Sequence, residues 1–276
     1  MTIRINSKPT STQQALRSSS ENKNQMDKTL EKLSSGRRLN RAADDAAGLA
    51  IANKLGEALK GLEQGMRNTY DGLSMAKASD GQMSMISQKL GRMRELTMVA
   101  ANGTLSEEQR DSVQEEFEVL KEEISRVAES AEFNGTRLLD GSAGAVDIAL
   151  GDGTGEVISL DLSHSLDADS LGLTDTRVDG SDGGNAQRAM EDIDEAMASV
   201  SSYQSELGAG SNRLASASRG LAITAENTYA SSSRIMDADF AVETSNLVRQ
   251  QILAQSSNAM LAQGKGLQLT ALNLLK

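Results

Sequence analysis

The chain has 276 residues and a formal net charge of −11, so we expect no nucleic-acid partner, because phosphate binding needs basic surface. It contains no cysteine, which excludes disulfides, thiolate metal sites and cysteine nucleophiles. Aromatic residues make up only 2% of the chain and there is a single proline, a composition typical of extended helical bundles.

The N-terminal residues, MTIRINSKPT, contain no apolar stretch of the kind that a secretory signal needs. No run anywhere approaches the ~18 apolar residues of a membrane span. We therefore expect no membrane span, and for an extracellular protein an export route without a cleaved signal peptide.

Residues 6–32 suit a helix but carry only four apolar side chains, Ala15, Leu16, Met26 and Leu30. Ordering each residue costs roughly 1–2 kcal/mol of backbone entropy. Burying one of the larger side chains returns only about 1.5–3 kcal/mol. This imbalance predicts an arm that is mobile in the monomer and is ordered by partners.

A polar run then leads into a long helical pattern between Leu33 and Leu55. Serine and glycine at its start favour a break in the helix, and its three arginines are expected to meet its two aspartates across that break. The predicted junction residues are Ser34, Ser35, Gly36, Arg37, Arg38, Arg41, Asp44 and Asp45.

An apolar seam with a seven-residue interval follows, which predicts a long first bundle helix. Its positions are Leu55, Leu62, Thr69, Ala76, Met83 and Leu90. Glycines inside the helix each cost about 1 kcal/mol relative to alanine, so we expect them to permit close approach of neighbouring backbones in a packed array, with local kinks as the alternative. These glycines are Gly56, Gly61, Gly65, Gly72, Gly81 and Gly91.

The second bundle helix is predicted to begin after a turn at residues 102–104, because Ser106 and Gln109 have the spacing of a capping box. Its apolar positions alternate steps of four and three: Val113, Phe117, Leu120, Ile124, Val127 and Ala131.

Beyond the turn signal Phe133-Asn134-Gly135, short alternating segments at 145–150 and 156–162 predict a β-hairpin region spanning about 133–185. The acidic residues between 140 and 184 indicate a surface loop.

Helix resumes near Ala186 with a strict seven-residue interval of apolar positions, which predicts a third bundle helix. A final segment after residue 237 carries two adjacent apolar stripes, so it is the natural partner of the N-terminal arm and of copies of itself. The predicted assembly residues of both ends are Leu16, Met26, Leu30, Phe240, Leu247, Leu253, Met260, Leu261, Leu267 and Leu274.

The predicted fold is mainly α: a long antiparallel helical bundle or coiled-coil rod with a small β-hairpin region. Residues 1–40 and 238–276 would form a terminal-helix assembly domain, and residues 41–237 the bundle domain. Burial that is completed only between subunits links folding to assembly, and a repeated contact that does not close yields a helical filament.

The sequence contains no arrangement of residues typical of a catalytic site. His164 is the sole histidine, so a Ser-His-Asp triad and a zinc protease motif are absent. The glycines of residues 151–155 fit a hairpin turn better than a phosphate cradle, and the aspartates of residues 161–182 do not have EF-hand spacing. We predict a non-enzyme without cofactor or metal.

The junction stretch resembles the N-terminal signature of bacterial flagellins in its LSSGR and ADDAAG segments, residues 33–37 and 43–48. The resemblance continues at residues 90–102 (LGRMRELTMVAAN), 126–139 (RVAESAEFNGTRLL) and 233–263 (SRIMDADFAVETSNLVRQQILAQSSNAMLAQ). The chain departs from the family pattern at residues 264–268, where flagellins commonly carry Asn-Gln-Pro-Gln-like residues. The acidic middle is short, which implies a flagellin without large outer domains.

This resemblance implies a filament subunit for swimming motility, with the terminal helices in an inner tube and the long helices in an outer tube. It implies an extracellular location, type III export, a flagellin export chaperone on the C-terminal segment, and hook-associated and cap proteins as partners. It also implies contact with a Toll-like flagellin receptor through Arg92, Leu96 and Glu116. The alternatives are a hook-filament junction protein, which shares the terminal-helix plan, and a coiled-coil adaptor.

Overall fold

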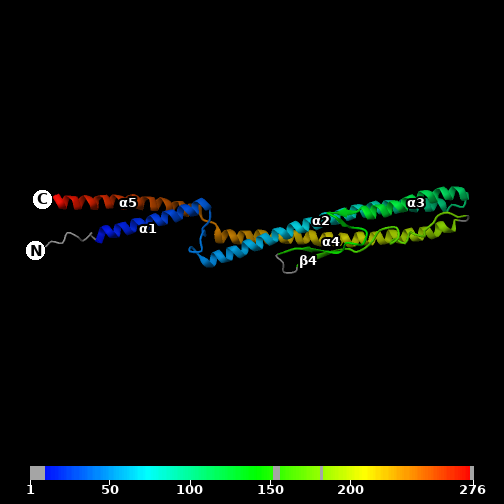
Figure 1. The fold of residues 1–276 in the computed structure, drawn as a ribbon, viewed down its shortest axis with the longest axis horizontal. Coiled ribbons are helices and arrows are strands. Elements are labelled where there is room, and N and C mark those ends of the chain that lie inside the picture. Colours follow the sequence, from blue (N-terminus) through cyan, green and yellow to red (C-terminus); the bar gives the residue numbers. More distant parts are fainter. Residues whose placement is uncertain (1–9, 152–155, 181–182, 274–276) are drawn as a thin grey trace. The chain divides into compact units, whose positions relative to one another are not determined.

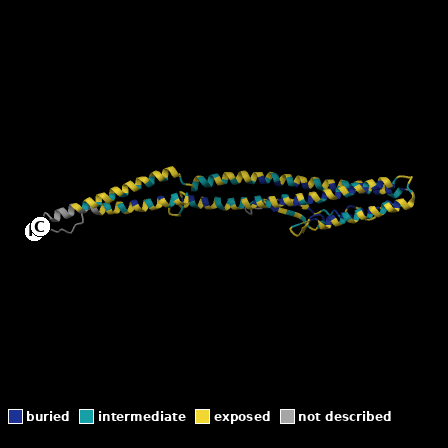
Figure 2. Cartoon of the chain, turned by 90° about the horizontal axis from the view of Figure 1, so that it is seen from above, coloured by how far each residue is buried: buried dark blue, intermediate teal, exposed yellow. Residues whose placement is uncertain are grey.

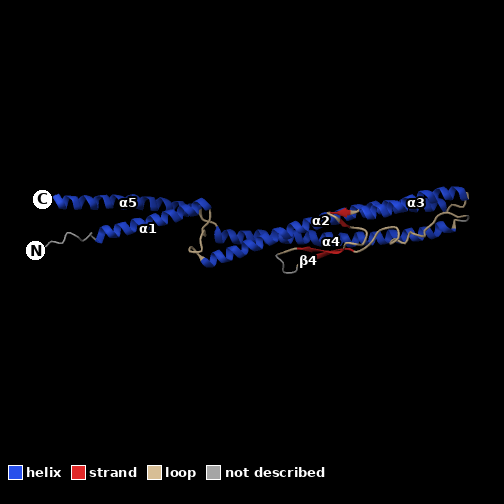
Figure 3. Cartoon of the chain, in the orientation of Figure 1, coloured by secondary structure: helices blue, strands red, loops and turns tan. Residues whose placement is uncertain are grey.

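A computed structural model describes residues 10–151, 156–180 and 183–273 of the chain (Figure 1). Within these ranges the helices are α1 (Thr10–Ser35), α2 (Ala46–Ala100), α3 (Glu107–Ser130), α4 (Gly184–Met236) and α5 (Phe240–Asn273). The strands are β1 (Glu132–Phe133), β2 (Thr136–Arg137), β3 (Gly144–Ala149) and β4 (Val157–Leu162). Figure 3 shows how far helix dominates, which confirms the predicted mainly α fold.

The chain divides into two compact units. The terminal unit contains residues 1–57 and 227–276, and the central unit contains residues 58–226. The boundaries lie within α2 and α4, so the terminal unit includes the first turns of α2 and the last turns of α4. The boundaries predicted at residues 40 and 238 lie inside the terminal unit. Both observed boundaries fall within a continuous helix, so no helix end marks them.

The central unit is built on α2, α3 and α4, whose inward side chains share one apolar core. The largest fully buried side chains are Phe117, Ile86, Leu90, Met93, Ile124, Leu138, Leu139, Leu160, Leu166, Leu173, Ile193 and Leu214. They come from every helix of the unit and from the chain between α3 and α4. The seven-residue patterns of α2 and α4 and the four-three pattern of α3 therefore predicted the core-facing side of each helix.

Helix α3 begins as predicted. Ser106 is its N-cap, its side chain accepts from the backbone N–H of Gln109, and the Gln109 side chain accepts from the backbone N–H of Ser106. Both contacts of the capping box are thus present, and orphan N–H groups of the first turn are satisfied.

Two antiparallel hairpins lie between α3 and α4. In the first, β1 pairs with β2 around Asn134 and Gly135, which have φ of 49° and 82° as a type I′ turn requires. In the second, β3 pairs with β4 from Gly144 opposite Leu162 to Ala149 opposite Val157. The predicted hairpin at 145–150 and 156–162 is confirmed, while the turn expected at residues 152–155 lies outside the described residues.

Glycines of α2 have two different environments. A Cβ on Gly65 would overlap with the backbone carbonyl of Leu150, and one on Gly72 would overlap with the side chain of Ile148. At Gly65 the backbone of the second hairpin approaches the helix closely, whereas at Gly72 the missing side chain leaves room for the side chain of Ile148. A Cβ on Gly56, Gly81 or Gly91 would meet nothing within 4 Å in the single chain, so these three glycines serve no close approach within it.

The acidic segment between β4 and α4 is not simply a surface loop. Leu166, Leu173 and Val178 are fully buried in the core of the central unit. Aspartates hold the segment's backbone: the carboxylate of Asp161 accepts from the N–H and hydroxyl of Ser163, and that of Asp167 accepts from the N–H of Ser170. The prediction of a solvated loop was wrong in this part, since the charges outnumber the apolar side chains that anchor the segment.

Candidate assembly surface

The terminal unit contains an antiparallel helix pair, α1 with α5. On each helix the less exposed positions alternate steps of four and three, as in a coiled-coil seam. On α1 these positions are Ala15, Ser19, Asn22, Met26, Thr29 and Leu33. On α5 they are Glu243, Leu247, Gln250, Ala254, Ser257, Leu261 and Gly264. Only four of these thirteen side chains are large and apolar, so the α1–α5 seam is mostly small or polar.

Polar contacts join the two helices across this seam. The side-chain amide of Asn22 donates to the backbone carbonyl of Gln250 at 2.8 Å, and Lys32 Nζ lies 3.5 Å from Glu243 Oε1. The ion pair is partly buried, and at 3.5 Å it is long, so its contribution is small, about 1 kcal/mol. The pair therefore lacks the apolar burial that would make two helices stable on their own.

Large apolar side chains of α1 and α5 point away from the α1–α5 seam. Figure 2 shows the terminal helices as mostly exposed, in contrast to the buried stretches of the central unit's helices. The exposed apolar side chains are Leu16, Leu30, Phe240, Val242, Val248, Ile252, Leu253 and Met260. Met260 is 65% exposed. Because these side chains and the seam leucines occupy different sides of α5, one partner helix cannot cover them all.

The structure divides the predicted assembly residues into two groups. Leu16, Leu30, Phe240, Leu253 and Met260 are exposed, whereas Met26, Leu247 and Leu261 are half-buried in the seam. The side chains of Leu267 and Leu274 lie outside the described residues. Sequence reasoning missed Val242, Val248 and Ile252, which fall between the two seven-residue stripes and whose only signal was the overall apolar character of the segment.

The junction turn connects the chain after α1 to the chain before α5. Helix α1 ends at Ser35, and Gly36 has a φ of 67°, in the left-handed region that favours glycine at a helix end. The N–H of Ala238 donates to the carbonyl of Gly36 at 3.0 Å, and the N–H of Arg38 donates to that of Met236 at 2.6 Å. The predicted helix break at residues 34–36 is therefore present.

The side chains of Arg38 and Arg41 contact groups other than the junction's aspartates. Arg38 donates to the carbonyl of Ile235, and Arg41 pairs with Glu31 at 3.0 Å. Arg37 lies in a backbone bridge with Asp237. The predicted pairing of arginine side chains with Asp44 and Asp45 was wrong, because both carboxylates accept hydrogen bonds from backbone N–H groups instead.

Asp44 and Asp45 organise the turn into α2. Asp44 accepts from the backbone N–H groups of Arg41 and Asn40, which lower the pKa of its carboxyl below the ordinary value. Asp45 accepts from the N–H of Gly48 at 2.9 Å and so caps the first turn of α2. The aspartate pair thus fixes where the helix starts.

Arg92 and Glu116 lie together on the central unit, while Leu96 does not join them at the surface. Arg92 Nη2 is 2.8 Å from Glu116 Oε1, and the hydrogen bonds to Glu116 and Glu95 raise the pKa of Arg92. Leu96 is only 5% exposed and belongs to the core.

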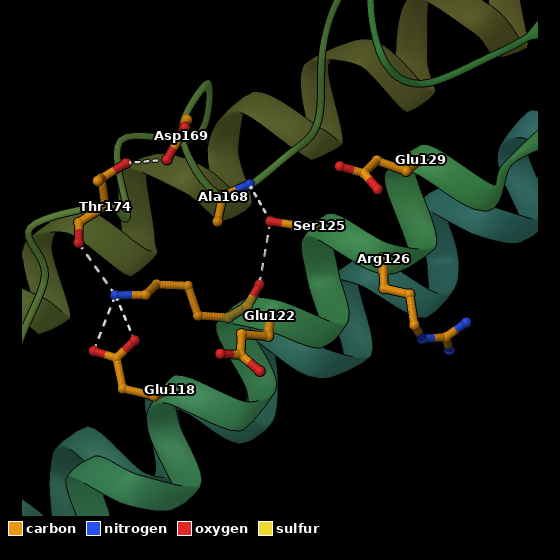
Figure 4. A pocket seen from close by; sticks show the side chains of 9 residues that line it. Glu118, Glu122, Ser125, Arg126, Glu129, Ala168, Asp169 and Thr174 are labelled. Carbon is orange, nitrogen blue, oxygen red and sulfur yellow. Dashed lines mark hydrogen bonds and ion pairs between the residues drawn. The ribbon is translucent and has the colours of Figure 1, made fainter.

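A polar hollow of about 520 Å³ lies between α3 and residues 168–174 (Figure 4). Lys121 crosses it, pairing with Glu118 at 2.8 Å and donating to the carbonyl of Thr174 at 3.1 Å. Ser125 accepts from the N–H of Ala168 at 3.2 Å. These hydrogen bonds and the ion pair join α3 to the segment that follows β4. The hollow therefore has a structural role.

Among the residues that the structure describes there is no metal-ligand cluster and no membrane-spanning helix. No group of three or more histidine, cysteine, aspartate or glutamate side chains there could hold an ion. The described helices also lack the long apolar window, nearly free of charges, that a membrane span requires.

His164 lies on the surface of the bundle. Its ring stacks on Tyr203 with ring centroids 3.9 Å apart, and its Nε2 lies 3.6 Å from Glu206 Oε2.

The chain matches two family descriptions. Residues 5–144 match the bacterial flagellin N-terminal helical region, and residues 190–275 match the bacterial flagellin C-terminal helical region. The unmatched part contains β4 and the acidic segment. The two matches together include α1, α2, α3 and α5 in full and α4 from residue 190 onward.

Individual proteins agree with this assignment. The chain is 41% identical to a flagellin of Halalkalibacterium halodurans over 92% of this chain and 93% of that protein. It is 37% identical to the flagellar filament 30.7 kDa core protein of Treponema maltophilum over 88% and 89% of the two chains. The crystal structure of Bacillus cereus flagellin, 31% identical, superimposes with a TM-score of 0.50 over 56% of this chain and 88% of that one. The chain therefore belongs to the bacterial flagellin family.

Proposed function

We propose that this chain is the structural subunit of a flagellar filament and that α1 and α5 form its assembly domain. The observation that carries the proposal is the set of large apolar side chains that α1 and α5 expose in the single chain. Burying one such side chain is worth about 1.5–3 kcal/mol. Contacts between copies would supply the stability that the α1–α5 seam lacks.

The distribution of these side chains favours a polymer over a closed dimer. Phe240, Val242, Ile252 and Met260 are exposed although α5 already has α1 as a partner. A two-fold dimer would cover one further side of the helix. Several neighbours are needed to cover the rest, and a repeated contact that does not close produces a helical filament.

A non-enzymatic role outside the cell follows from this proposal. The family is a structural one, and the filament subunit accounts for the exposed terminal helices without any catalytic group. The match to flagellin at both ends of the chain favours this role over the hook-filament junction protein and the coiled-coil adaptor.

Further partners are proposed for the same surface. An export chaperone would cover the apolar side chains of α5 before assembly, and hook-associated and cap proteins would meet the terminal helices at the two filament ends. For a Toll-like flagellin receptor, the exposed pair of Arg92 and Glu116 remains the proposed contact. Replacing each of them by alanine and measuring receptor activation tests that contact.

The assembly proposal is tested by placing a charge on the exposed face of α5. In Ile252→Asp and Met260→Asp we expect a normally folded monomer, because both side chains are exposed in the single chain. Filament mass after sedimentation should fall at least about tenfold, since a carboxylate buried between copies costs several kcal/mol.

The matched control is Ser84→Asp, which adds the same charge at an exposed polar position of α2. This variant should polymerise as the unchanged chain does. Negative-stain images separate the alternatives, because a junction protein would form no long filaments. Unimpaired polymerisation of both α5 variants would refute the proposed assembly domain.

A further inference from the structure

A polar layer lies in the middle of the α1–α5 seam. Asn22 is 8% exposed, and its side-chain amide reaches across to the backbone carbonyl of Gln250. Thr29, one heptad along α1, is also buried, and its hydroxyl donates to the carbonyl of Gln25 on its own helix. The Asn22 side chain thus makes a hydrogen bond across the seam. A coiled coil ordinarily carries an apolar side chain at such a position.

The layer is incompletely satisfied. Asn22 Oδ1 and Gln250 Oε1 are both shielded from solvent and accept no hydrogen bond from any residue that the structure describes. A buried acceptor left without a donor loses the free energy of its hydration. Two such acceptors lie at one level of a helix pair that has little apolar burial to offset them.

We propose that the Asn22–Gln250 layer fixes the register of α1 against α5 and, in doing so, keeps this pair marginally stable in the single chain. The role that we give to this low stability rests on the proposed function. In a filament, neighbouring copies would cover the outer faces of α1 and α5, and the pair would become firmly ordered only then. A buried asparagine at one coiled-coil position specifies register at a cost in stability in the same way.

The neighbouring seam positions explain why register needs a polar contact. Ala15, Ser19 and Thr29 are small, so these seam positions bury little apolar surface and discriminate only weakly between pairings shifted by one heptad. The backbone hydrogen bonds of the junction turn hold the helices together near residues 36–38. Asn22 lies about four turns of helix away from that turn, where it can exclude slipped pairings.

The stability half of the proposal is tested with the full-length double variant Asn22→Leu/Gln250→Leu as a monomer. Replacing both polar side chains by apolar ones removes the unsatisfied acceptors. We expect amide protection in α1 and α5 to rise at least about tenfold in hydrogen exchange. The matched control is Thr29→Val, which removes a satisfied hydroxyl from the same seam and should change protection by less than about threefold.

The register half is tested by disulfide trapping, which the cysteine-free chain permits. Cysteines at 32 and 243 report the observed register, because Lys32 and Glu243 are in contact. Cysteines at 25 and 243 report a pairing shifted by one heptad. With Asn22 and Gln250 present, only the 32–243 pair should cross-link efficiently, and in the double leucine variant the 25–243 pair should gain cross-linking at its expense.

Either of two results overturns the proposal: unchanged or lower protection in the double leucine variant, or retention of the single 32–243 cross-link. Both measurements are made on monomers, so they do not depend on filament formation. Failure of the unchanged chain to polymerise would instead refute the proposed function and leave these two results to stand by themselves.

Discussion

Gly65 of α2 lies against the backbone carbonyl of Leu150, so closely that a Cβ at residue 65 would overlap with that oxygen. Asn68, one turn along the helix, donates its side-chain amide to the carbonyl of Ala149 at 3.0 Å. The end of β3 is therefore held on α2 through backbone groups, and the absent side chain of Gly65 makes the contact possible.

Gly65→Ala should destabilise the central unit by about 1–2 kcal/mol. The gain of up to ~1 kcal/mol in helix propensity is outweighed by moving the hairpin away from the helix. The midpoint of urea unfolding, followed by circular dichroism, measures the change. Gly81→Ala is the control: it faces open space on the same helix and should stabilise the protein by about 0.5–1 kcal/mol. Equal effects of the two substitutions would contradict the close contact.

Arg110→Met should cost roughly 3 kcal/mol of stability. Arg110 is 2% exposed, and its guanidinium donates to the carbonyls of Ala100, Asn102 and Gly180. Methionine fills similar space but leaves these acceptors without their donor. Thermal unfolding compares it with Arg126→Met, an exposed arginine of the same helix that pairs with Glu123, for which a loss below about 1 kcal/mol is expected. A small loss at residue 110 would show that water replaces its hydrogen bonds.

Ser106→Ala should destabilise α3 by about 1 kcal/mol, because it removes the acceptor of one N–H in the first turn. Ser106→Asp should restore most of that loss, since its carboxylate can accept the same bond and lies near the positive end of the helix dipole. Hydrogen exchange of the first turn of α3 gives the local readout. Equal exchange in the alanine and aspartate variants would argue against the cap.

Acid should loosen the segment between the β3–β4 hairpin and α4 before it unfolds the helices. Hydrogen bonds from Ser163 lower the pKa of Asp161 at the end of β4, and Arg177 lowers the pKa of Asp179. A carboxyl whose pKa is lower in the folded state stabilises that state above its unfolded value of about 4, and this stabilisation is lost as the pH falls through the folded pKa.

Hydrogen exchange between pH 5 and pH 2.5 measures this effect, after correction for the intrinsic pH dependence of exchange. Protection of residues 163–180 should decline earlier than that of α2 and α4. The variant Asp161→Asn keeps an acceptor for Ser163 but cannot titrate, so the decline next to residue 161 should become shallower. A simultaneous loss of protection in segment and helices would contradict this order.

The helices and their caps could be predicted from the sequence because their signals are local. The seven-residue interval of α2 and α4, the Ser106–Gln109 box and the Asn134-Gly135 turn each require only neighbouring residues to be satisfied. Their positions in the structure agree with the expectation within a few residues.

Other features depend on residues far apart in the chain and left no such signal. Leu166 and Leu173 lie in a segment without a helical or strand period, so their burial depends on the helices against which the segment packs. Arg38 reaches the carbonyl of Ile235, 197 residues away. The difference between Gly65 and Gly81 likewise depends on where the second hairpin lies, which no helix pattern records.

The apolar side chains that α5 exposes on the sides not covered by α1 have a consequence for how growth begins. Two or three copies meeting in solution could cover only part of each other's α5, so they would separate readily. A copy arriving at the end of an existing filament would find several neighbours already in place. The same surface that makes elongation favourable therefore makes spontaneous initiation slow, and new filaments should start chiefly where a template already presents the neighbouring helices.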